Sequence, residues 1–172
     1  MKYLLVHIVS EPSKTRIYDC IHQLMEDYSV FDMSGIEPHI TLKYYFDTSH
    51  LSAVEAACRA AASYDWGKFT LETVDNFSKE TIFLTVQPDE LLRTAYQKLV
   101  RGLEDSKVPF LEHEQGGAHL HLTLAQQVPS SSFDAIVREL DAKDFSAQCS
   151  FDNLTILKFN GSDFVVHKRY EV

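Results

Sequence analysis

The stretch AHLHLTLAQ, residues 118–126, alternates polar and apolar side chains. His119, His121 and Thr123 occupy one set of alternate positions, and three leucines occupy the other. Successive side chains of a β-strand point to opposite faces, so this alternation predicts a strand with one polar and one apolar face. The leucines are expected to face the core. The polar row then faces away from the core and is a candidate for chemistry.

A second stretch of the same kind, PHITLKYYF, spans residues 38–46 and places His39 and Thr41 on one strand face. His39 and His121 are 82 positions apart, and the same gapless shift aligns the threonines of the two stretches. Aromatic positions farther along align as well: Phe69 with Phe151, and Phe77 with Phe159. We therefore predict a pseudo-repeat of about 39–86 with 121–168, within a single domain that covers residues 1–172.

Hydrophobic periodicity predicts strands and helices in both halves. The expected strands are 2–9, 37–46, 67–76, 80–87, 118–127, 147–159 and 163–171, and the expected helices are 13–27, 50–63, 89–106 and 131–141. This pattern predicts an α+β, bilobal duplicated fold. Two antiparallel-rich sheets are expected around a central cleft, with the motif strands facing each other across it and the helices on the outer faces. The segment EHEQGG, residues 112–117, is expected to be a mobile loop.

Composition limits the possible partners. The formal net charge of −9 and the pI of about 5.3 argue against tight binding to a long phosphate backbone, but they permit a small phosphate or an RNA end. The three cysteines are scattered, which predicts neither a disulfide framework nor a thiolate zinc site. No apolar run approaches the roughly 20 residues of a membrane span. A cytoplasmic monomer without membrane contact is expected.

Two His-x-Thr pairs provide the groups that phosphodiester chemistry needs. Histidine has an unperturbed pKa of about 6.5, so one imidazole can act as a base while another, protonated, acts as an acid. The catalytic candidates are His39 and His121, and the hydroxyls of Thr41 and Thr123 can bind phosphate oxygens. No metal or other cofactor is required. Lys43 and Tyr45 continue the first row and are candidates for neutralising phosphate and stacking on a base.

Two alternative functions stay open for these residues. His119 and His121 form a His-x-His pair, which with a third ligand would suit a zinc hydrolase. The threonines would then have no role. The chain can also be a nucleotide-binding module without turnover. His119 itself aligns with Glu37 in the repeat, so a supporting hydrogen bond or plain exposure is expected there.

The motifs HITL and HLTL, about half a chain apart, resemble those of the two-histidine (2H) phosphoesterase superfamily, particularly its 2′-5′ RNA ligase-like and cyclic phosphodiesterase members. The resemblance covers essentially the whole chain. It implies a bilobal fold with both motifs in a central groove.

The resemblance also implies an enzyme that hydrolyses 2′,3′-cyclic phosphates, or forms and cleaves 2′-5′ linkages, without a metal. Its substrate would be a nucleotide or an RNA end. His39 and His121 would be the catalytic pair, with Thr41 and Thr123 as phosphate ligands. RNA ligase-like members often carry arginine where this chain has Gln126, which argues against ligase-like binding of RNA ends. The direction of the reaction and the assignment of acid and base stay open.

Overall fold

A computed structural model of the protein describes residues 1–111, 114 and 119–172. The helices are α1 (Ser13–Tyr28), α2 (Leu51–Ala61), α3 (Glu90–Asp105) and α4 (Phe133–Asp141), with a short 3-10 helix at Thr48–His50. The strands are β1 (Lys2–Ile8), β2 (His39–Asp47), β3 (Lys68–Phe77), β4 (Thr81–Pro88), β5 (His121–Gln126), β6 (Ala147–Ser150), β7 (Asn153–Phe159) and β8 (Phe164–Glu171). The predicted α+β class is confirmed. Except for Glu114, the predicted mobile loop at 112–117 lies outside the described residues.

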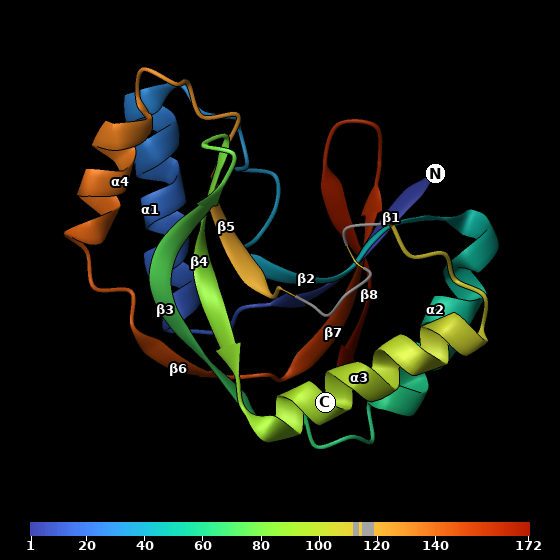
Figure 1. The fold of residues 1–172 in the computed structure, drawn as a ribbon. Coiled ribbons are helices and arrows are strands. Elements are labelled where there is room, and N and C mark those ends of the chain that lie inside the picture. The colour runs from blue at the N-terminus through green and yellow to red at the C-terminus, as the bar shows by residue number, and fades with distance from the viewer. Residues whose placement is uncertain (112–113, 115–118) are drawn as a thin grey trace.

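The eight strands form one antiparallel sheet, in the order β6-β3-β4-β5-β2-β1-β7-β8. The two motif strands, β2 and β5, are neighbours in the middle of this order and pair through Ile40 and Leu122. The sequence predicted two sheets around a central cleft, with the motif strands facing each other across it. Instead, the motif strands are hydrogen-bonded neighbours, and their pairing joins both halves into one curled sheet (Figure 1).

The segment 147–159, expected as one strand, is two. β6 pairs with β3 at one edge of the sheet, whereas β7 pairs with β1 and β8 in the other half. The chain crosses between the halves at Phe151, whose buried ring stacks on Trp66 with centroids 4.6 Å apart. The apolar alternation of 147–151 is interrupted by Asp152 and Asn153 and resumes in the opposite phase at Leu154, which is consistent with two strands.

The helices lie on the outer side of the curled sheet, as predicted (Figure 1). α1 contacts β5 and α4 contacts β3, while α2 packs against α3. The core between helices and sheet contains the apolar positions of both motif strands, namely Ile40, Leu42, Leu122 and Leu124. The alternate positions of those strands therefore face away from the helices.

The element bounds support the pseudo-repeat, which stays a prediction. A shift of 82 carries the first residues of β2 and α2, His39 and Leu51, onto the first residues of β5 and α4, His121 and Phe133. Among the described residues, no helix is both long and apolar enough to cross a membrane.

Candidate active site

The four motif residues form a compact array on the face of the sheet opposite the helices. Ile40 and Leu122 are paired in antiparallel register. Continuing this register by one residue in each direction places His39 across from Thr123, and Thr41 across from His121. Side chains directly opposite each other have Cβ atoms roughly 5 Å apart, and diagonal neighbours roughly 7–8 Å. The two histidines therefore lie on one diagonal of the array, and the two threonines on the other.

The neighbouring strands extend this array on both sides. β1 places Ile8 beside His39 and Val6 beside Thr41, and β4 places its own residues beside β5. The resulting rows are Ile8–His39–Thr123–Phe83 and Val6–Thr41–His121–Thr85. The motif side chains are half-buried, whereas Ile8, Val6 and Phe83 are almost fully buried. The imidazoles of His39 and His121 are therefore partly desolvated and lie beside buried apolar side chains.

Both histidines are oriented in the same way. The Nδ1 of His39 lies 2.8 Å from the carbonyl oxygen of Glu37, and the Nδ1 of His121 lies 2.9 Å from that of His119. A carbonyl oxygen only accepts, so each Nδ1 carries the hydrogen and donates it. In the neutral ring this assigns the lone pair to Nε2. Each Nε2 can then take a proton from a substrate, or return one after protonation.

Burial lowers the pKa of both His39 and His121 below the ordinary value of 6.5, because desolvation penalises the imidazolium. The bonds to the two carbonyls act in the opposite direction. The nearby His121 lowers the pKa of His39 further, and His119 has the same effect on His121. Both rings are thus biased to the neutral form, and an anion bound between them would favour protonation of one.

Lys43 does not continue the row of His39 and Thr41. The β1–β2 register shifts between Val6 and Leu5, and Lys43 pairs with the core residue Leu5. This bulge turns the Lys43 side chain toward the core, where it is fully buried. The prediction that Lys43 continues this row, where it could neutralise phosphate, is therefore wrong, because an irregular strand breaks the two-residue period.

The buried ammonium of Lys43 binds the Glu114 carboxylate, with Nζ 2.7 Å from Oε2. Glu114 also accepts hydrogen bonds from the backbone N–H groups of Tyr44 and Leu111. The ion pair thus ties the connection between α3 and β5 to β2. Tyr45 lies beyond the bulge and is partly exposed, with its ring near that of Phe164. A role for Tyr45 in substrate binding stays a prediction.

Three residues beside His121 were not predicted as site residues. Thr85 lies directly across from His121, and the Phe83 and Phe77 rings have centroids 5.0 and 5.1 Å from its ring. Phe83 and Thr85 come from β4, and Phe77 ends β3. No local motif marks them, because their relation to His121 depends on the register of the β4–β5 pair. The ring of His119 is exposed, and its centroid is 6.3 Å from that of His121.

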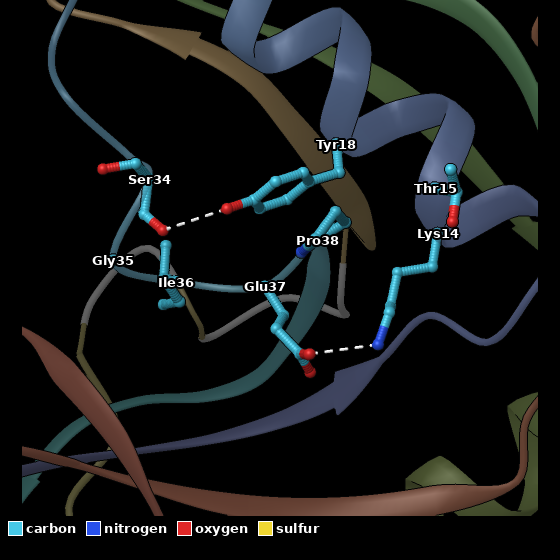
Figure 2. Close-up of a pocket in the computed structure, with 8 residues that line it drawn as sticks. All are labelled: Lys14, Thr15, Tyr18, Ser34, Gly35, Ile36, Glu37 and Pro38. Atoms are coloured by element: carbon cyan, nitrogen blue, oxygen red, sulfur yellow. Dashed lines mark hydrogen bonds and ion pairs between the residues drawn. The ribbon is translucent and has the colours of Figure 1, made fainter.

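A pocket of about 290 Å³ lies beside the first motif (Figure 2). It is lined by the first turns of α1 and by residues 34–38, which lead directly into His39. Lys14 Nζ binds the Glu37 carboxylate at 3.0 Å across this pocket. Because the Glu37 carbonyl accepts the hydrogen bond from His39, the pocket wall also supports the orientation of the first catalytic candidate.

Within residues 1–111, 114 and 119–172, no group of three or more His, Cys, Asp or Glu side chains is arranged to hold a metal ion. In the described part of the chain, His119 and His121 thus have no third partner for the zinc alternative.

A family model, the 2′-5′ RNA ligase superfamily, matches residues 10–163 of the sequence. The chain belongs to this superfamily. The sequence has no match among curated proteins.

Several solved structures have the same fold as this chain. The protein TT0787 of Thermus thermophilus has a TM-score of 0.69 and 14% identity, with 99% of this chain and 97% of that chain covered. LigT of E. coli in its apo form has a TM-score of 0.65 and 14% identity, with coverages of 99% and 96%. The PDE domain of MHV ns2 has a TM-score of 0.60 and 15% identity, with both chains covered completely. LigT has also been crystallised with 3′-AMP and with ATP.

Proposed function

We propose that this 2′-5′ RNA ligase superfamily member is a metal-independent phosphoesterase. Its substrates would be 2′,3′-cyclic phosphates or 2′-5′ phosphodiester linkages of nucleotides or RNA ends, and the reverse ligation would use the same groups. The observation that carries the proposal is the matched pair of Nδ1–carbonyl bonds at His39 and His121, which makes Nε2 the reactive nitrogen in both motifs.

The proposed hydrolysis follows from the diagonal arrangement of the two imidazoles. The neutral ring takes a proton from water through Nε2 while the water oxygen forms a bond to phosphorus. The bond from phosphorus to the 2′ or 3′ oxygen breaks, and the protonated ring donates its Nε2 hydrogen to that oxygen. In-line displacement needs attacking and leaving oxygens on opposite sides of phosphorus, which suits one general base and one general acid on opposite corners of the array.

The hydroxyls of Thr41 and Thr123 occupy the other two corners. From there they can donate hydrogen bonds to the two non-bridging oxygens, whose charge increases as the nucleophile adds. The partly apolar surroundings strengthen these bonds, because they reduce competition from water. The relatives support the substrate class: LigT binds 3′-AMP in a solved structure, and another solved relative is a PDE domain.

The proposal is tested with a panel of 2′,3′-cyclic nucleotides and 2′-5′-linked dinucleotides, with product identification. Turnover of at least one class is expected, and it should persist in EDTA because the acid, the base and the anion ligands all belong to the protein. Loss of turnover in EDTA, with recovery of turnover when zinc is added, would favour the His119–His121 metal site. Nucleotide binding without turnover on the whole panel would favour the binding module.

Variants of the two histidines test whether both imidazoles are needed for turnover. His39→Ala and His121→Ala should each remove nearly all turnover, and the double variant should be little worse, because groups that act as a unit are strongly non-additive. His50→Gln is a suitable control, since His50 lies in the 3-10 helix before α2. A His39→Ala variant with near-normal kcat would contradict the two-histidine mechanism.

A further inference from the structure

An exposed aromatic ring stands beside the second motif. Phe77, the last residue of β3, is 43% exposed although it is a large apolar side chain. Its ring lies 4.3 Å from that of Phe83 at an interplanar angle of 32°, so Phe83 covers one of its faces. Phe83 is 1% exposed and is held in register opposite Thr123. Phe77 is therefore supported by a buried ring and is itself still largely exposed.

Phe77 is also in contact with the reactive part of the proposed site. Its centroid is 5.1 Å from that of His121, and the two rings are nearly perpendicular, at 85°. A second histidine, His119, is 5.9 Å away. Any group stacked on the open side of Phe77 is thus adjacent to His121 and to a phosphate held between the motifs.

We propose that Phe77, supported by Phe83, is the stacking platform for the nucleobase attached to the phosphate. This inference deepens the proposed function and rests on it for the position of the phosphate. Every nucleobase has a π-face, so stacking on an aromatic ring tolerates different bases. The platform predicts a ligand that carries a base, with weak discrimination among bases, and it assigns the base to the side of the site that contains β3 and β4.

The test compares two probes: 3′-AMP, which carries a nucleoside on its phosphate, and inorganic phosphate, which does not. Calorimetric titration of the full chain with each probe gives the dissociation constants. Phe77→Ala should weaken 3′-AMP binding by roughly 5- to 150-fold, the range expected for loss of one stacked base, while phosphate binding changes less than about twofold. Phe77→Trp should restore most of the affinity for 3′-AMP, because tryptophan also offers a flat ring.

A matched control is Leu91→Ala, which removes another exposed apolar side chain, from α3, and should leave both affinities unchanged. Equal losses for both probes in Phe77→Ala would overturn the inference, because Phe77 would then act by supporting His121. An unchanged affinity for 3′-AMP, or no 3′-AMP binding by the unmodified protein, would overturn it as well. Absence of turnover on the substrate panel, with base-dependent binding retained, would contradict the proposed catalysis but not the platform.

Discussion

Ile40 and Leu122 pair across the junction of the two halves of the sheet, and each directly follows a motif histidine. Because their side chains are buried on the helix side, His39 and His121 are fixed on the opposite face in antiparallel register. The apolar pair thus sets the relative position of the catalytic candidates.

The threonine hydroxyls are expected to contribute through the transition state. Thr41→Ala or Thr123→Ala should lower kcat by about 10²-fold or more, the cost of removing one oxyanion donor. Thr→Ser at either position should retain most of the activity, because the hydroxyl is kept. Steady-state kinetics on one cyclic substrate measures this, with folding checked by circular dichroism. An alanine variant with unchanged kcat would show that the phosphate is held elsewhere.

The rate should depend on pH as a bell-shaped curve whose two limbs belong to the coupled histidine pair. Catalysis requires one neutral and one protonated ring, and the pKa values of both His39 and His121 are lowered below 6.5. The singly protonated pair is therefore most populated below pH 6.5, and kcat/KM should be greatest there. The maximum of kcat should lie at higher pH, because bound phosphate favours the imidazolium. A kcat/KM maximum above pH 6.5 would contradict the cited shifts.

The ion pair between Lys43 and Glu114 should matter mainly for stability. Lys43→Met should lower the free energy of unfolding by about 3 kcal/mol, since it removes one partner of a buried pair and leaves the other charge uncompensated. Lys14→Met, which breaks the more exposed pair with Glu37, should cost less than about 1 kcal/mol. Urea unfolding of the two variants checks the difference. Similar decreases in the free energy of unfolding in both variants would show that burial of the ion pair does not determine the cost of breaking it.

His7 should make the fold sensitive to acid. Burial lowers its pKa from 6.5 to about 4, and its ring stacks on Phe151 at 4.2 Å. The pKa of His7 is lower in the folded state than in the unfolded state. The contribution of neutral His7 to the free energy of unfolding is therefore fully present above pH 6.5 and is lost as the pH falls toward 4. The decrease in the free energy of unfolding should approach about 3 kcal/mol.

Urea unfolding across this pH range tests the effect of His7. A His7→Phe variant should lose much of the acid dependence, although other buried groups keep their own. His50→Gln serves as the control and should keep the dependence of the unmodified protein. A His7→Phe variant that is as acid-sensitive as the unmodified protein would assign the effect to other groups.

The alternation in the two motifs was sufficient to predict strands, their apolar faces and the four motif residues of the candidate site. The predicted helices were also present, because residues such as Ile17 and Leu24 recur at the helical period on a buried face. These features are local: the two-residue and 3.6-residue periods depend only on backbone geometry and on which side chains avoid water.

Only the tertiary structure showed that β2 and β5 are neighbours in one sheet, that a bulge buries Lys43, and that Phe77, Phe83 and Thr85 surround His121. Each of these depends on strand register, and register is decided by pairing between segments far apart in the chain. A shift of one residue would move a side chain to the other face of the sheet without changing the local sequence pattern. The sequence by itself therefore determined which residues are candidates for the chemistry. The pairing of distant strands decided which of these candidates lie together and which residues surround them.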